Sequence, residues 1–162
     1  MSLETMSPKY SLPEIERRWL VHVEHLPSLS TVRRREIEDK YIHGGRLRLR
    51  AVREQNGNAI FKLGKKYSRT GAGPEHVVSV YLSEEEYGVL QELPGAVAKK
   101  SRYSFEGGAL DIYEHTHASP CVFEMEFTSH AEATAYSPPA FVADEITFDA
   151  RYTGYALAQE AL

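Results

Sequence analysis

The sequence predicts a mostly β protein of the α+β class: a closed, antiparallel, eight-stranded barrel with a charged interior and a few peripheral helices. Three observations lead to this prediction. Apolar and polar residues alternate with a period of two through most of the chain, which is typical of β-strands. Glycine-containing turn signals separate several of these runs. Basic and acidic residues are sorted onto different strands, and a barrel of about eight strands can hold an interior ligand.

The eight strands follow from the alternating runs and the turns between them. We expect them at 14–22, 38–43, 45–53, 58–67, 76–82, 98–106, 109–115 and 121–128. Asn56-Gly57 and Gly107-Gly108 predict tight turns between neighbouring strands, and Gly44-Gly45 marks another reversal of the chain.

The helices are expected to be few and short. Ser83 followed by Glu86 is a capping box, which predicts a helix that ends before Pro94-Gly95. Ser129 and Glu132 repeat the signature and predict a helix near 130–136. Two more helices are expected over 27–35 and 153–162.

Size and composition fit a single globular domain. The chain has 162 residues, of which 42% are hydrophobic and 26% charged, and these values exclude whole-chain disorder. We expect a flexible leader over 1–13 and one domain over 14–162. The sequence has neither an apolar run long enough to span a membrane nor an opening signal-peptide pattern, so we expect a cytoplasmic protein. The formal charge of −4 argues against binding nucleic acid through the whole surface.

Several strands carry charge on one face and apolar side chains on the other, because successive side chains of a strand point in opposite directions. Arg46, Arg48 and Arg50 share a face, as do Glu124 and Glu126. In a single strand this pattern is typical of a solvated outer surface. A generic surface would mix the two signs of charge, however, whereas here they are sorted by strand. The sorting favours a barrel whose charged faces point inward.

Such a lumen would contain an excess of positive charge. Its cations would be Arg18, Arg46, Arg48, Arg50, Lys62, Lys66, Lys100 and Arg102, and its anions Glu14, Glu16, Asp111, Glu124 and Glu126. Enclosed, unpaired charge is costly, so a compensating anion is expected. Arginine forks match phosphate oxygens, and paired carboxylates suit Mg²⁺ or Mn²⁺. The lumen therefore predicts a metal-bridged polyphosphate site.

These strands also resemble, in order, the motifs of the CYTH, or triphosphate tunnel metalloenzyme, family. The similar segments are Glu14-Ile15-Glu16-Arg17-Arg18 (ExExK), Arg48-Leu49-Arg50 (RLR), Phe61-Lys62-Leu63-Gly64-Lys65-Lys66 (TxK), Lys100-Ser101-Arg102-Tyr103 (KTRY), Leu110-Asp111-Ile112-Tyr113 (LDVF), Phe123-Glu124-Met125-Glu126-Phe127 (EVEF) and Glu145-Ile146-Thr147 with Arg151-Tyr152 (EVT…RY). The match covers nearly the whole chain. The sequence departs from the family pattern in two ways. Arg18 replaces a lysine, and the strand at 76–82 lacks the glutamates that many relatives carry.

The resemblance implies a tunnel enzyme that uses Mg²⁺ or Mn²⁺ to hydrolyse the terminal phosphate of inorganic tripolyphosphate or a small organic triphosphate. The implied metal ligands are Glu14, Glu16, Glu124 and Glu126. Glu14, Glu16, Arg18, Lys100 and Arg102 would be catalytic. The implied phosphate-binding residues are Arg46, Arg48, Arg50, Lys62, Lys66, Lys100 and Arg102, supported by Asp111 and Glu145.

Two alternatives are open at this point. The same family includes adenylate cyclases, in which a ribose hydroxyl replaces water as the nucleophile. A barrel that binds a polyphosphate or nucleotide without turnover is the second alternative. In each case the expected partner is a small molecule, with no nucleic acid and no membrane, and the protein is either a monomer or a homodimer.

Overall fold

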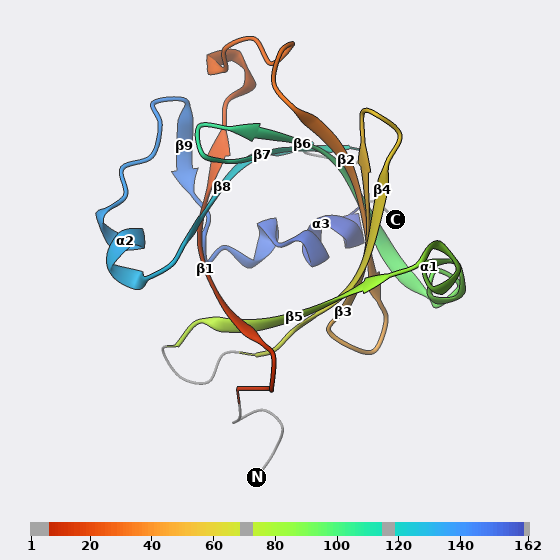
Figure 1. Ribbon diagram of the computed structural model, residues 1–162. Helices are drawn as coiled ribbons and strands as arrows, with labels where there is room; N and C mark the ends of the chain where they lie inside the picture. Colours follow the sequence, from red (N-terminus) through yellow and green to blue (C-terminus); the bar gives the residue numbers. More distant parts are fainter. Residues whose placement is uncertain (1–6, 69–72, 115–118, 161–162) are drawn as a thin grey trace.

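The computed structural model describes residues 7–68, 73–114 and 119–160. Nine strands form one antiparallel sheet in the order β5-β4-β3-β2-β6-β7-β8-β1-β9, and a further pairing between β5 and β1 closes the first eight into a barrel (Figure 1). The expected closed, eight-stranded barrel is therefore confirmed. No helix in the described ranges is long and apolar enough to cross a membrane.

The bounds of the strands agree with the expected runs to within a few residues at most ends. The strands are β1 (Leu12–Val21), β2 (Arg34–Ile42), β3 (Leu47–Glu54), β4 (Ala59–Lys66), β5 (Glu75–Leu82), β6 (Gly95–Phe105), β7 (Gly108–Glu114), β8 (Cys121–Phe127) and β9 (Val142–Glu145). Strand β1 already begins inside the expected leader, because Leu12 and Pro13 pair with β5. Strand β9 was not expected, and it lies beside β1.

The helices are short and peripheral. They are α1 (Glu84–Leu90), α2 (His130–Ala135) and α3 (Gly154–Glu160), with 3-10 turns η2 (Val23–His25) and η3 (Ala150–Tyr152). The predicted helix over 27–35 is wrong. Its last two residues open β2, where Arg35 pairs with Glu54 on one side and Arg102 on the other. Pairing with both neighbouring strands outweighs the local helical preference of this segment.

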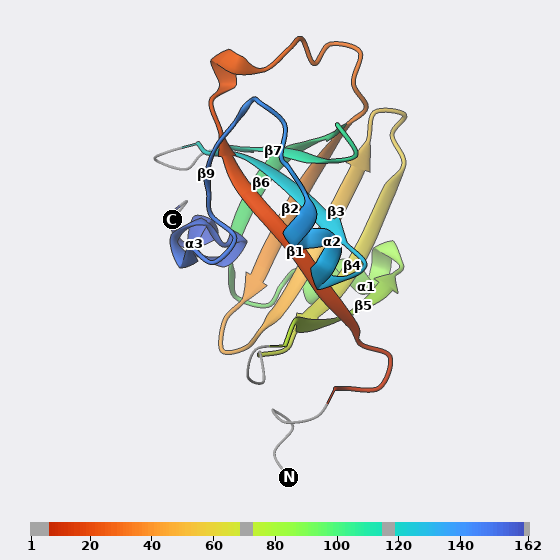
Figure 2. The same cartoon turned by 90° about the vertical axis from the view of Figure 1, so that its left-hand side faces the viewer.

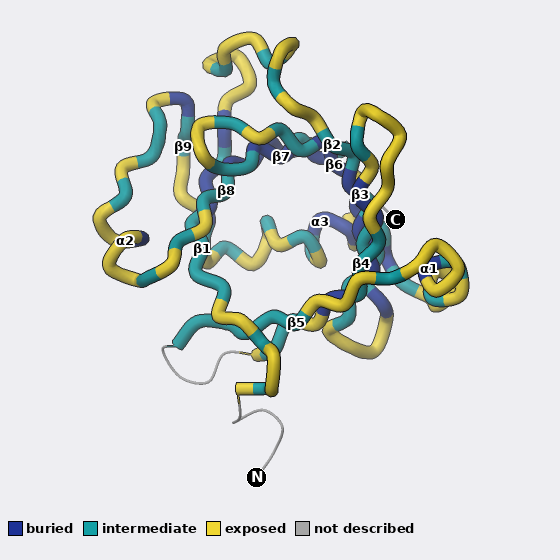
Figure 3. The backbone as a smooth tube through the Cα atoms, viewed as in Figure 1, coloured by how far each residue is buried: buried dark blue, intermediate teal, exposed yellow. Residues whose placement is uncertain are grey.

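The apolar faces of the strands point outward and are covered by the peripheral segments. Trp19 and Phe123 are almost completely buried, and they pack with Phe141. Phe141 belongs to the segment that carries α2 and β9, which lies on the outside of the barrel beside β1 (Figure 2). On another side of the barrel, Phe61 of β4 stacks on Tyr87 of α1 with ring centroids 4.5 Å apart. Each of the eight barrel strands except β5 contains buried positions (Figure 3). The inner faces carry charged side chains such as Arg50, Lys100 and Glu124.

Helix α3 occupies one end of the barrel. Seen along the barrel it lies within the ring of strands, and seen from the side it lies at one end (Figures 1 and 2). Its buried residues Leu157 and Ala158 pack against Ala96, Ala98 and other inner residues of that end. The small side chains at the start of β6 make room for the helix, and the charged part of the lumen begins directly after them.

Candidate functional site

The inner face of the barrel encloses a cavity of about 1050 Å³. It is lined by most of the charged residues that the sequence predicted for a lumen. Its cations include Arg18, Arg46, Arg48, Arg50, Lys66, Lys100 and Arg102, and its carboxylates include Glu14, Glu16, Glu75, Glu124, Glu126 and Glu145. Residues from both ends of the chain thus meet around one space, because the barrel is closed by pairing of β1 with β5 and β8.

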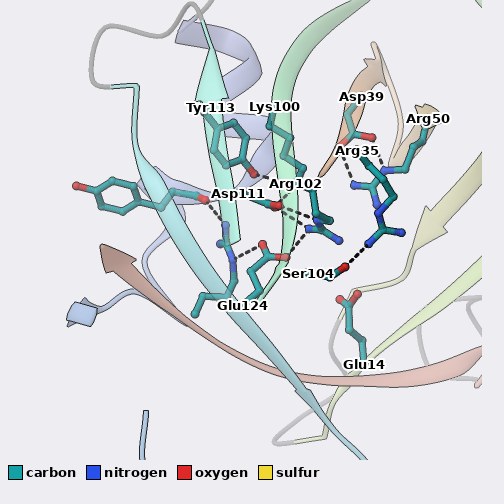
Figure 4. Close-up of polar contacts among 12 residues, drawn as sticks. Glu14, Arg35, Asp39, Arg50, Lys100, Arg102, Ser104, Asp111, Tyr113 and Glu124 are labelled. Atoms are coloured by element: carbon teal, nitrogen blue, oxygen red, sulfur yellow. Dashed lines mark hydrogen bonds and ion pairs between the residues drawn. The ribbon is translucent and has the colours of Figure 1, made fainter. Parts of the chain in front are cut away.

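Asp111 holds two of these cations from behind. It is fully buried on β7, and its carboxylate accepts hydrogen bonds from Lys100 Nζ at 2.6 Å and from Arg102 Nε and Nη2 at 2.6 Å each (Figure 4). Burial alone would raise the pKa of Asp111, but Lys100 and Arg102 lower it well below its ordinary value. Arg102 also donates to Glu124 Oε2 at 2.7 Å. Asp111 therefore orients the two cations, as the supporting role implied, and does not itself line the cavity.

Asp39 has the same role on the neighbouring strands, and the sequence analysis missed it. Its carboxylate is buried on β2 and accepts hydrogen bonds from Arg50 Nε and Nη2 at 2.6 and 2.7 Å. Arg48 Nε lies 3.8 Å from the same carboxylate. Burial opposes ionisation, yet Arg50 and Arg48 lower the pKa of Asp39 to about 2. The signal that could have indicated this role is that Asp39 stands directly opposite Arg50. That register is known only after β2 and β3 have been paired.

Glu16, like Glu126, is a cavity-lining carboxylate without a hydrogen-bond or ion-pair partner among the described residues. Glu126 stands opposite it on β8. Burial raises the pKa of Glu16 to about 7, with further contributions from the negative charges of Glu124 and Glu14. A cavity-facing carboxylate that resists ionisation in this way would be stabilised by a bound cation.

Glu75 supplies a carboxylate where none was expected. Strand β5 begins one residue earlier than predicted, at Glu75, which stands opposite Glu14 across the pairing that closes the barrel. Lys66 Nζ lies 2.5 Å from Glu14 Oε2 and 3.3 Å from Glu75 Oε2, so it bridges the two acids. Arg46 also contacts Glu75, at 3.4 Å. Residues 76–82 do lack glutamates, but the strand as a whole does not lack an acid that faces the cavity.

Three predicted site residues have other partners. Arg18 is buried and donates to Glu124 Oε1 at 3.1 Å and to the backbone oxygen of Tyr152 at 2.9 Å, just before α3. Glu145 borders the cavity, but its carboxylate binds Arg17 at 2.7 and 2.8 Å. Lys62 is not among the residues that line the cavity, and its ammonium lies over the Tyr81 ring, 5.0 Å from the centroid.

The donor atoms suit a divalent ion that is only partly held by protein. In the described ranges, no three acidic, histidine or cysteine side chains already stand together as a metal cluster. Glu16, with Glu14, Glu124 and Glu126 around it, nevertheless offers only the hard oxygen ligands that Mg²⁺ and Mn²⁺ prefer. Mg²⁺ is usually bound by one or two carboxylates and completed by water and substrate phosphates. The residues present therefore fit such an ion.

The raised pKa of Glu16 predicts how stability depends on pH. Between its ordinary value of 4.5 and about 7 the folded chain binds more protons than the unfolded chain, so stability falls as the pH rises through this range. Without divalent ions at pH 8, Glu16→Gln should therefore be more stable than the wild type, by about 1–3 kcal/mol. Urea unfolding at pH 8 and pH 4 measures this difference, which should vanish at pH 4. Equal stability at pH 8 would contradict the proposed environment of Glu16.

Comparison with known proteins supports the fold. Neither the protein-family models nor the curated proteins gave a match. Two solved structures of a protein called NE1496, described once as a hypothetical protein and once as an inorganic triphosphatase, are similar with a TM-score of 0.58 and 24% identity, over 90% of this chain and 97% of theirs. A protein of Bacillus halodurans, provisionally described as an adenylate cyclase, gives a TM-score of 0.49 and 19% identity over 80% of this chain and 86% of its own. The likeness to the NE1496 structures shows that this chain shares their fold, and the closed barrel that the resemblance implied is present.

Proposed function

We propose that this chain is a triphosphatase of the CYTH family that depends on Mg²⁺ or Mn²⁺ and hydrolyses the terminal phosphate of inorganic tripolyphosphate or a small organic triphosphate. One observation carries the proposal. The unpartnered Glu16 carboxylate lines the same cavity as Arg48, Arg50, Lys100 and Arg102. A metal ion would neutralise the charge of the carboxylate, and a polyanion would neutralise the charge of the four cations. The similar fold of a protein described as an inorganic triphosphatase agrees with this choice.

The cations would bind the phosphates along the cavity wall. Asp39 and Asp111 hold Arg50 and Arg102 through two hydrogen bonds each, which fixes the planes of both guanidinium groups before any substrate arrives. Such preorganised donors stabilise the charge on a phosphoryl group in transfer without further rearrangement. Arg48 is about one-third exposed, and within the described ranges its one ion-pair contact is the long one with Asp39, so its donors are available to a phosphate.

The acidic side would hold the metal. Glu14, Glu16, Glu124 and Glu126 are the proposed ligands, and a bound divalent ion would supply charge neutralisation and activation of water. Glu124 already accepts hydrogen bonds from Arg18 and Arg102, which fix the position of its carboxylate. In this proposal Arg18 acts through Glu124, while Lys66 and Arg46 add positive charge near the substrate. Lys62, which does not line the cavity, has no direct role in it. The protein would work on a small triphosphate in the cytoplasm.

Phosphate release from tripolyphosphate, measured with Mg²⁺, with Mn²⁺ and with EDTA, tests this function. We expect release that requires one of the two ions. ATP tested in parallel distinguishes the alternatives: ADP and phosphate indicate hydrolysis, whereas cyclic AMP indicates a cyclase. Tight binding of tripolyphosphate without turnover under either ion would instead identify a binding barrel and overturn the proposal.

A further inference from the structure

Arg35 is an arginine of the inner sheet face that neither the expected motifs nor the proposed chemistry uses, and it lies beyond the residues that line the cavity, as does Ser104. It lies near the start of β2 and stands directly opposite Arg102 of β6 and Glu54 of β3. Opposed residues in a sheet point to the same face, so Arg35 belongs to the inner face with Arg102. The predicted helix over 27–35 had placed this arginine on a peripheral segment.

The guanidinium group of Arg35 is poorly satisfied. Its Nε is buried and has no hydrogen-bond partner, and Nη2 donates to Ser104 Oγ only at the long distance of 3.5 Å (Figure 4). Among the described residues no carboxylate forms an ion pair with it. Glu54, which stands opposite, instead accepts hydrogen bonds from Arg33 at 2.9 and 3.3 Å.

Arginine donors left without an acceptor in a partly buried place are costly, and an anion relieves that cost. The nearby carboxylates cannot serve, because Asp39 is bound to Arg50, and Asp111 is bound to Lys100 and Arg102. The acceptor that Arg35 lacks would therefore come from a ligand.

The position of Arg35 shows where that ligand would lie. Along β6 the inner residues run from Ala96 and Ala98, under α3, to Lys100, Arg102 and then Ser104. Successive inner positions of a strand are about 7 Å apart. Arg35 and Ser104 therefore continue the row of phosphate-binding cations by one further position, away from the end that α3 occupies.

We propose that Arg35 and Ser104 form an additional anion subsite, which binds the fourth phosphate group of a linear polyphosphate longer than tripolyphosphate. The inference rests on the proposed function, because it assumes that the first three phosphates lie along Arg48, Arg50, Lys100 and Arg102. It extends that function to a substrate class, since the subsite contributes only when the chain of phosphates is long enough to reach it.

Isothermal titration with tripolyphosphate and with tetrapolyphosphate, in EDTA to prevent turnover, tests the subsite. The wild type should bind tetrapolyphosphate more tightly than tripolyphosphate. Arg35→Gln should weaken the binding of tetrapolyphosphate about tenfold or more, the effect of a lost charge-assisted hydrogen bond, and change tripolyphosphate binding less than twofold. The matched control is Arg34→Gln, which removes the same charge from the outer face, where Arg34 contacts Ser101 and Glu36. It should change neither affinity.

Equal losses for both ligands, or no loss for either, would overturn the subsite. If Arg35→Gln fails to give the wild-type circular dichroism spectrum, Ser104→Ala and Arg35→Lys replace it and should lower the preference for tetrapolyphosphate in the same direction. A wild type that binds neither polyphosphate in EDTA would overturn the subsite, whereas the proposed function is decided separately by phosphate release from tripolyphosphate with Mg²⁺ or Mn²⁺. A wild type that binds both with the expected preference, but hydrolyses neither when Mn²⁺ is added, would refute the triphosphatase alone.

Discussion

Glu16→Gln should lower the kcat for tripolyphosphate hydrolysis by about a hundredfold or more. Changing a residue that merely supports a metal ligand already lowers metal affinity or activity ten- to a hundredfold. Glu16 is proposed as a ligand itself. Glutamine keeps the shape of the side chain but removes the charge that a divalent ion would neutralise. Initial rates of phosphate release at saturating Mn²⁺ and substrate measure the effect.

The control for this variant is Glu38→Gln. Glu38 lies on the outer face of β2, where Lys99 contacts it at 3.2 Å, so its loss should leave kcat unchanged. A second measurement separates metal binding from chemistry. Mn²⁺ should raise the melting temperature of the wild type but not that of Glu16→Gln, because an ion that binds only the folded state stabilises it. An unchanged kcat for Glu16→Gln would remove Glu16 from the site.

Asp111→Asn should lower the free energy of unfolding by about 3–5 kcal/mol, the cost of removing one partner from a buried ion pair. The carboxylate is fully buried and is shared by Lys100 and Arg102, so its loss leaves Lys100 without its ion-pair partner and Arg102 with Glu124 alone. An asparagine has one acceptor oxygen and cannot replace both contacts. Urea denaturation at pH 7 measures the difference.

The same variant has a pH signature. Because Lys100 and Arg102 lower the pKa of Asp111 in the folded state, its contribution to stability is complete above the ordinary value of 3.8 and declines as the pH falls below it. The difference in the free energy of unfolding between the wild type and Asp111→Asn should therefore become smaller at acid pH. Asp149→Asn is the control, since Asp149 pairs with the exposed Arg151, and it should lower the free energy of unfolding far less than Asp111→Asn does. Wild-type stability in Asp111→Asn would contradict the buried ion pairs.

The alternation of residues was sufficient to predict the strands and their faces. Period-two patterning assigns every side chain of a strand to one face or the other, so Arg48 and Arg50 could be placed together, and Glu124 with Glu126, without a structure. The sorted signs of charge then indicated which faces look inward. The Ser-x-x-Glu signatures located α1 and α2 for a similarly local reason, since they depend on contacts within four residues: a full capping box at α1, and at α2 the Ser129 cap with Glu132 bound to Thr128.

Local patterns failed where distant strands decide the outcome. The segment over 27–35 has no strong strand signal of its own, and Arg35 is extended because β3 and β6 flank it. Strand β9 is only four residues long and exists because β1 offers it an edge. Glu75 lies outside the strand that the sequence predicts over 76–82. In the structure its pairing with Glu14 makes it the first residue of β5.

The sequence by itself thus determined that this protein is a barrel of eight strands with charge inside, because alternation is a property of each strand alone. Only the tertiary structure decided which charged side chains form ion pairs with one another. The registers between β2 and β3, β6 and β7, and β1 and β8 pair Asp39 with Arg50 and Asp111 with Arg102. They leave Glu16 without a partner among the described residues. A register is set by the packing of whole strands and the closure of the barrel, and a shift of one residue would have moved every partner to the opposite face.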